Sequence, residues 1–211
     1  MTKKLPEVDP LSFLPIRYED MRQPVVSSQF AHGIKVLTAG RIVSMDIKTG
    51  RKGNLMMVVT LRDEGGFFQV KFFHFAKLHE TVFGYTNMRV YLWGAPRAEQ
   101  SGWCLYHPEF PDEIGRILPV YRCEKGISQT RMRDHVWHAT QRLMETIEDE
   151  ISPDVLERLG LPTISEALRQ IHYPTDRVPD ETVLQRLAYR EEGRFSPAKS
   201  NIPIKEVVGY V

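Results

Sequence analysis

The chain has 211 residues, of which 42% are hydrophobic and 26% charged, so it can bury the core of one ordinary domain and a smaller one. The formal net charge of +1 excludes a chain that is basic throughout, so any surface for nucleic acid must be a local patch. Two cysteines make no disulfide framework, and no apolar run approaches the roughly 20 residues of a membrane-spanning helix. We therefore expect a cytoplasmic protein with no membrane partner.

Residues 1–32 are punctuated by proline and predict an extended lead-in that packs on the domain that follows. Residues 33–117 carry the pattern of a β domain, with Gly-rich turns and a bulge or bend at Gly40. Strands are expected over residues 34–45, 55–61, 67–75, 88–94 and 102–107, with a short helix over 76–83. Three strands, a helical connection and two more strands are the order of an OB-fold, a five-stranded Greek-key barrel.

The composition then changes, and residues 118–190 predict a helical region. A Ser cap opens a helix at Ser128, and Pro153 stands in the first turn of a second. Thr163 and Glu166 form a capping box for a third helix, and a fourth runs from Thr182 to about residue 190. Residues 191–211 show no convincing period and predict a partly disordered tail. The fold class expected is mainly β with an α subdomain.

The strand over residues 67–75 contains an unusual number of aromatic side chains. Alternation places Phe68, Val70 and Phe72 on a face that looks like core. The opposite face carries Phe67, Gln69, Lys71, Phe73 and Phe75. Aromatic rings beside a cation on a solvent face are typical of a surface that stacks on nucleic-acid bases, although a strand buried on both faces is the alternative. This strand is the third in an order typical of an OB-fold, and that position favours the binding face over burial on both faces.

The candidate DNA-binding residues follow from this face. Phe73 is the best candidate for base stacking, while Phe75 shares its face but is closer to the core. The candidate phosphate contacts are Lys71, Lys77, Arg51, Lys52 and Arg62. For Lys71 and Lys77, plain solvated charge is the alternative. The histidines are scattered, and Cys104, His107 and Cys123 lack a fourth ligand nearby, so we predict no metal, no cofactor and no catalytic constellation.

Several short segments in order resemble one family. They are residues 14–20 (LPIRYED), 72–75 (FFHF), 107–109 (HPE), 118–121 (LPVY), 126–129 (GISQ), 166–174 (EALRQIHYP) and 186–189 (RLAY). The chain resembles the N-terminal wedge region of RecG-type ATP-dependent branched-DNA helicases. The resemblance implies an OB-fold wedge at the branch point of a stalled replication fork, with Phe73 stacked on the base pair at the junction. Some members have a second aromatic residue four positions on; here that residue is Lys77, which could touch phosphate but cannot stack as a ring does.

The motor of that family needs a P-loop, G-x-x-x-x-G-K-[ST], and this sequence has none. The resemblance therefore predicts a non-catalytic module that binds forked or single-stranded DNA in fork repair and recombination. A separate helicase motor or another replication or repair protein is a further expected partner. The alternatives are an OB-fold protein-interaction module, or a truncated helicase remnant without motor activity.

Overall fold

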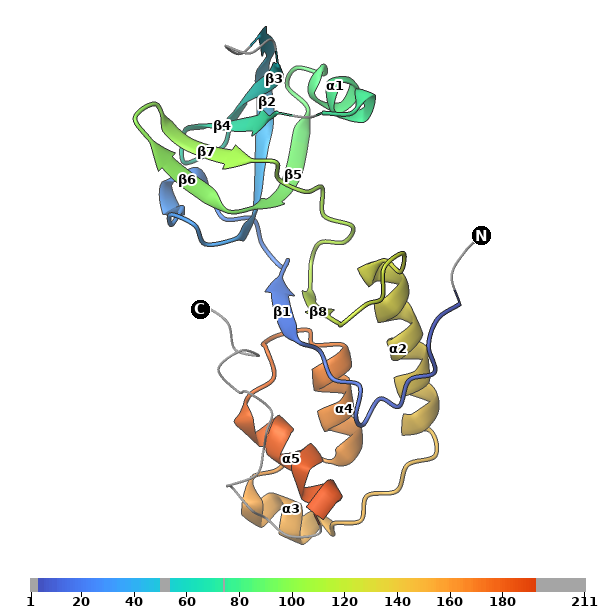
Figure 1. The fold of residues 1–211 in the computed structure, drawn as a ribbon. Coiled ribbons are helices and arrows are strands. Elements are labelled where there is room, and N and C mark those ends of the chain that lie inside the picture. The colour runs from blue at the N-terminus through green and yellow to red at the C-terminus, as the bar shows by residue number, and fades with distance from the viewer. Residues whose placement is uncertain (1–3, 50–53, 74, 193–211) are drawn as a thin grey trace. The chain divides into compact units, whose positions relative to one another are not determined.

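The computed structural model describes residues 4–49, 54–73 and 75–192. The chain divides into two compact units (Figure 1). One is continuous and spans residues 20–115, and we call it the sheet unit. The other, the helical unit, combines the described parts of residues 1–19 and 116–211. The chain thus leaves the helical unit once, forms the sheet unit and returns.

Six strands form the sheet of the sheet unit. In chain order they are β2 (Val36–Thr49), β3 (Leu55–Arg62), β4 (Phe67–Phe72), β5 (Arg89–Gly94), β6 (Pro96–Glu99) and β7 (Gly102–Tyr106). Their spatial order is β5-β2-β3-β4-β7-β6, and every neighbouring pair is antiparallel except β4 and β7. A short helix, α1 (Lys77–Phe83), connects β4 to β5. The order of the strands, the helical connection between β4 and β5, and the helices that follow the sheet confirm the expected OB-like fold with an α subdomain.

The sequence pattern predicts β5, as a strand over residues 88–94, but not β6, which follows it. Only Ala95 separates them, yet β5 pairs with β2 and β6 pairs with β7, at opposite edges of the sheet. Among the described residues no ladder joins β5 to β6, so the barrel is not closed by hydrogen bonds. The chain therefore changes direction at Ala95, so that two consecutive strands pair at opposite edges of the sheet.

The irregularity in β2 lies three residues beyond Gly40. The register between β2 and β3 shifts between Ile42 and Ser44, which leaves Val43 unpaired and 45% exposed. Gly40 itself pairs regularly with Val90. A Cβ at Gly40 would lie 3.1 Å from the Phe68 ring, so glycine is needed there for close packing, and the bulge expected at this residue is wrong.

The core of the sheet unit confirms the predicted inner face of β4. Phe68, Val70 and Phe72 are each at most 2% exposed. They pack with Met57, Val59 and Leu61 from β3 and with Phe83 from α1. Phe30, which follows the 3₁₀ helix η1 (Ser27–Gln29), closes this core with its ring 5.5 Å from that of Phe68.

The helical unit contains a two-stranded ribbon and four helices. The ribbon pairs β1 (Arg17–Asp20) with β8 (Ile117–Val120), neither of which the sequence pattern predicts. The helices are α2 (Gln129–Met144), α3 (Pro153–Leu159), α4 (Ile164–His172) and α5 (Glu181–Glu192). The predicted caps are confirmed: Ser128 Oγ accepts from the Arg131 N–H, and Thr163 with Glu166 forms a capping box.

His172 joins three segments in the interior of the helical unit. Its Nε2 lies 2.8 Å from the carbonyl oxygen of Pro10, and its Nδ1 lies 2.9 Å from the Tyr121 hydroxyl. A carbonyl can only accept, so the neutral ring carries its proton on Nε2 and Nδ1 accepts from Tyr121. Burial lowers the pKa of His172 to about 4, although the Pro10 hydrogen bond opposes the shift.

No helix among the described residues is both long enough and apolar enough to cross a membrane.

Candidate nucleic-acid interface

The outer face of β4 exposes an aromatic ring at each end. Phe67 is 60% exposed, and Phe73, which directly follows the strand, is 44% exposed. Between them Gln69 and Lys71 are half-buried. The face is therefore accessible at its two ends and partly covered in the middle.

The ring of Phe73 packs against two other rings. Its ring stacks on Tyr106 with a centroid distance of 5.7 Å and an interplanar angle of 17°, and it is tilted against His107 at 5.6 Å. Its backbone N–H donates to His107 Nε2 at 3.3 Å. We call Phe73, Tyr106 and His107 the aromatic platform. Such a group of rings holds Phe73 in place while leaving much of it exposed.

The pairing of β4 with β7 builds this platform. Lys71 pairs with Tyr106 in the parallel ladder, and the His107 N–H donates to the Lys71 carbonyl oxygen at 3.0 Å. His107 has a φ of +45°, an uncommon conformation for a residue other than glycine, which turns the chain out of β7. Tyr106 and His107 could not be recognised as site residues from the sequence, because His107 lies 34 residues after Phe73 and only the pairing of β4 with β7 reveals the contact.

Lys71 is not a free cation. Its Nζ lies 2.8 Å from Glu99 Oε2 and 5.6 Å from the centre of the Tyr106 ring, and its side chain is only 15% exposed. Burial alone would lower the pKa of Lys71, but the hydrogen bond to Glu99 and nearby negative groups outweigh it and raise the pKa. The hydrogen bonds from Lys71 and Tyr106 lower the pKa of Glu99. Lys71 therefore holds the platform through Glu99.

Arg97 supplies an exposed cation at the platform. Its guanidinium lies over the Tyr106 ring, on which Phe73 also stacks, at 5.7 Å from the ring centre. Arg97 could not be recognised from the sequence, because it lies on β6, a strand that the pattern did not predict.

The other sequence-predicted residues lie in different places. Phe75 is half-buried and packs against the core of the sheet unit, as its alternative interpretation expects, whereas Lys77 is exposed in the first turn of α1. Arg62 is exposed at the end of β3, opposite Phe67 at the start of β4, with its guanidinium 5.6 Å from the centre of the Phe67 ring. Arg51 and Lys52 lie outside the described residues. The structure therefore groups Phe73 and Lys71 together and places Arg62 elsewhere.

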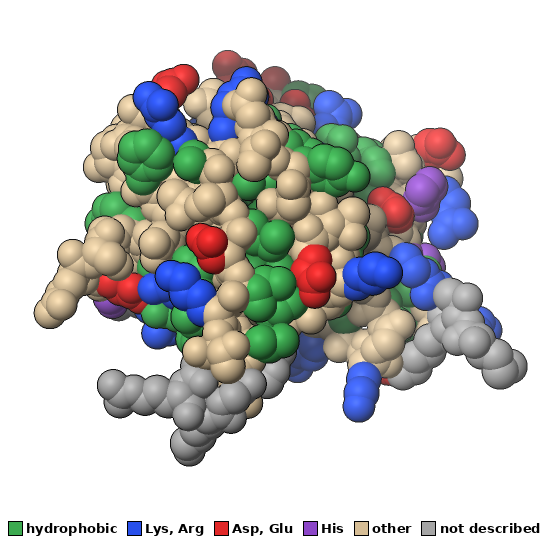
Figure 2. Space-filling view, turned by 90° about the horizontal axis from the view of Figure 1, so that it is seen from above, with side chains coloured by type: hydrophobic (Ala, Val, Ile, Leu, Met, Phe, Trp, Pro, Cys, Tyr) green, Lys and Arg blue, Asp and Glu red, His purple; other side chains and the backbone are tan. Residues whose placement is uncertain are grey.

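The molecular surface agrees with the near-neutral charge. Apolar, basic and acidic side chains are interspersed over the face seen in Figure 2, without a large area of one charge. Within the described ranges, no three His, Cys, Asp or Glu side chains are placed to hold a metal ion. What the arrangement offers is an exposed ring beside an exposed cation, Arg97, which suits a planar base and its phosphate.

Comparison with known proteins gives a consistent set of relatives. A protein of Thermotoga maritima named ATP-dependent DNA helicase RecG is 29% identical over 189 residues, which cover 87% of this chain and 24% of the relative. The protein of the same name from Escherichia coli strain K12 is 25% identical over 210 residues, covering 96% of this chain and 29% of the relative. The chain thus spans between 24% and 29% of the length of these two relatives.

A solved structure of RecG bound to a three-way DNA junction matches the fold with a TM-score of 0.62 and 26% identity. The match covers 86% of this chain and 25% of that chain. A family model, described as the RecG wedge domain, matches residues 7–142, well over half of the chain. The chain therefore belongs to the RecG wedge domain family.

Proposed function

We propose that this chain is a DNA-binding wedge module that recognises forked or branched DNA. The observation that carries the proposal is the aromatic platform: Phe73 is exposed, supported by Tyr106 and His107, in a chain of the RecG wedge family. One relative of known structure is a RecG bound to a three-way DNA junction, which supports a branched substrate here.

In this proposal Phe73 stacks on the base pair at the branch. Such a stack contributes about 1–3 kcal/mol per base in single-strand binders. Arg97 and Lys77, both exposed, contact phosphates next to it, while Lys71 positions Tyr106 through Glu99. Arg51 and Lys52 remain proposed phosphate contacts on sequence grounds alone.

The module has no catalytic role of its own in this proposal. The match to the RecG relatives is confined to their wedge region, so strand separation would need force from a helicase motor. The partner proposed is therefore a helicase motor, or a replication or repair protein that brings one to the branch.

The test is a fluorescence anisotropy titration with a fork, a single strand and a linear duplex at low salt. We expect the fork to bind most tightly, and Phe73→Ala to weaken fork binding by about tenfold because the stack is lost. Tyr85→Ala is the matched control, since Tyr85 is an aromatic residue of the same unit with 61% exposure outside the platform. Equal affinity for the three DNAs would contradict the proposal.

A protein-interaction module is the second candidate, and the net charge of +1 is the observation that favours it. The two candidates differ in their salt dependence. Phosphate contacts release counterions and lose affinity steeply as salt rises, whereas apolar protein contacts do not. A titration of the fork between 50 and 200 mM salt, in which affinity stays flat, would favour a protein partner.

A further inference from the structure

Three arginines lie side by side across three strands of the sheet unit. Arg41 of β2 pairs with Arg89 of β5 on one side and with Arg62 of β3 on the other. Directly paired residues point to the same face of a sheet, so the three side chains share one face. All three are exposed. We call Arg89, Arg41 and Arg62 the arginine ladder.

The arginine ladder costs stability in the free protein, because like charges directly opposite each other repel. No described acidic side chain forms a salt bridge with any of the three. Their contacts restrain them without neutralising them. Arg41 Nη1 donates to the Asn87 carbonyl oxygen at 3.0 Å, and the guanidinium of Arg89 lies 5.3 Å from the centre of the Tyr91 ring.

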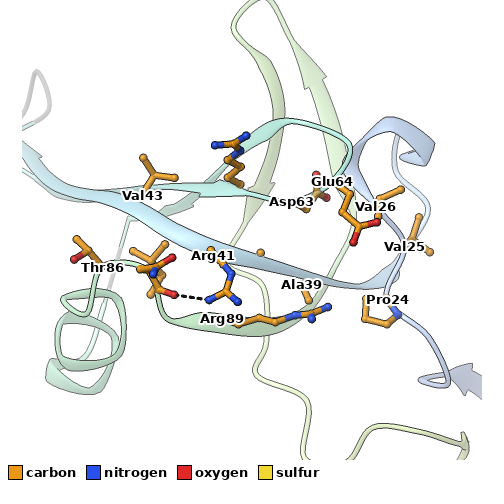
Figure 3. Close-up of a pocket in the computed structure, with 14 residues that line it drawn as sticks. Pro24, Val25, Val26, Ala39, Arg41, Val43, Asp63, Glu64, Thr86 and Arg89 are labelled. Atoms are coloured by element: carbon orange, nitrogen blue, oxygen red, sulfur yellow. Dashed lines mark hydrogen bonds between the residues drawn. The ribbon is translucent and has the colours of Figure 1, made fainter.

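The arginine ladder lines a groove of about 850 Å³ (Figure 3). The segment of residues 24–26 borders the groove on one side and Thr86 on another, and the hydrogen bond from Arg41 to the Asn87 carbonyl oxygen is drawn as a dashed line. A groove with three fixed cations and no salt-bridged anion is suited to a chain of phosphates.

Two acidic residues also line the groove, Asp63 and Glu64. The carboxylate of Asp63 is already used by the turn after β3, where it accepts hydrogen bonds from the N–H and Oγ of Ser27 and from the N–H groups of Gly65 and Gly66. Glu64 is exposed. Neither carboxylate forms a salt bridge with the arginine ladder, and three arginines against these two carboxylates leave the groove with a small excess of positive charge.

An exposed ring continues the same row. Arg62 pairs with Phe67 of β4, so the row runs from Arg89 through Arg41 and Arg62 to Phe67 across four strands. Cations that follow a backbone, next to a ring on which a base can stack, are the combination used to bind single strands. Neighbouring strands are about 4.8 Å apart, so the arginine ladder spans about 10 Å, a distance that several consecutive phosphates can follow.

We propose that the arginine ladder binds the phosphate backbone of a single DNA strand, with Phe67 stacked on an unpaired base. The inference rests on the proposed function, because it takes the phosphates to be those of DNA. The site is separate from the aromatic platform: Phe67 and Phe73 are six residues apart along β4, or about 20 Å. One strand of a branch would thus occupy the groove while Phe73 contacts the branch itself.

The test compares Arg41→Gln/Arg62→Gln/Arg89→Gln with the wild-type full chain, using a twelve-nucleotide oligothymidylate as the probe. The triple variant is expected to bind this probe at least tenfold more weakly at low salt. The slope of log K against log salt is expected to fall in magnitude by about 2, because each lost contact to single-stranded phosphate removes about 0.7. Arg142→Gln/Arg158→Gln/Arg169→Gln, which removes three exposed arginines of the helical unit, is the charge-matched control.

A thermal melt at low salt supplies a second readout. Without DNA, the triple variant is expected to unfold at a higher temperature than the wild type, since the repulsion is gone. The oligothymidylate is expected to raise the melting temperature of the wild type but not that of the variant. A variant with the same probe affinity, salt slope and melting temperature as the charge-matched control would overturn the inference, as would a wild type that does not bind the probe at low salt.

The two proposals fail separately in these experiments. Phe73→Ala is expected to reduce the preference for the fork and to leave oligothymidylate binding within twofold of wild type. Loss of probe binding in the arginine variant, with no fork preference in the wild type, would support single-strand binding by the arginine ladder and contradict the wedge function. A fork preference that depends on Phe73, with unchanged probe binding in the arginine variant, would contradict only the ladder.

Discussion

Lys71 shows how the role of one residue depends on neighbours that the local sequence does not reveal. Alternation alone makes it a cation on an outer face, beside aromatic rings. The structure places Glu99 from β6 against it, so its charge is paired and its function is to hold Tyr106. Arg97, which no local pattern distinguishes, lies instead as the exposed cation over the same ring.

Glu99→Gln tests this assignment. We expect the variant to lose stability on the order of 1 kcal/mol in urea unfolding, because a half-buried salt bridge is lost. We also expect it to bind fork DNA a few times more tightly at low salt, because Lys71 is released and the net charge rises by one.

Glu109→Gln is the control for that variant. It breaks the pair of Glu109 with Lys35, whose side chains are 70% and 40% exposed, so only a small effect on stability is expected. If both variants bind DNA equally, the paired state of Lys71 does not matter for binding.

At the scale of elements, the signals that could be read from sequence are those that act over short distances. The inner face of β4, the Ser128 cap and the Thr163–Glu166 capping box depend on alternation or on neighbours three residues away, and the structure confirms them. The β4–β7 pairing, the β1–β8 ribbon and the arginine ladder join distant segments. Only part of the site could therefore be predicted, because chain geometry rather than local composition brings Tyr106 and Arg97 to it.

His172 is such a long-range junction, since it connects α4 to Pro10 and Tyr121. Its pKa is about 4 in the folded protein and about 6.5 in the unfolded chain, so the unfolded chain binds the proton more readily. The stabilising effect of neutral His172 is complete above pH 6.5 and is lost as the pH falls toward 4.

We therefore expect His172 to account for a loss of up to about 3 kcal/mol between pH 7 and pH 4, measured by urea unfolding at a series of pH values. His172→Gln is expected to remove this part of the pH dependence. His138→Gln, at an exposed histidine on α2, is the control and is expected to keep it. The same pH profile in all three proteins would contradict the role of His172.

At the scale of the whole molecule, the sheet unit is one continuous segment of the chain whose two ends are hydrogen-bonded to each other. The Gly115 N–H donates to the Met21 carbonyl oxygen at 2.7 Å, where the unit begins and ends. Its core draws on its own residues from Val25 to Phe110. These features favour a unit that can fold alone.

We expect residues 20–115 to fold as a separate fragment, with a cooperative thermal transition and a near-UV circular dichroism signal. A fragment of residues 33–117, which begins where the sequence pattern places the barrel, is expected to be less stable. It lacks Phe30, which packs on Phe68 and Trp103, and Ser27, which hydrogen-bonds to Asp63. Equal stability of the two fragments would show that residues 20–32 contribute nothing to the unit.

The arginine ladder also has a consequence for how sequences of this unit can vary. Three repelling guanidinium groups oppose folding, so mutation and selection for folding alone would replace them early. Binding of DNA would favour keeping all three despite this cost. Substitutions at positions 41, 62 and 89 in descendants of this chain would therefore indicate that DNA binding had been lost while the fold was retained.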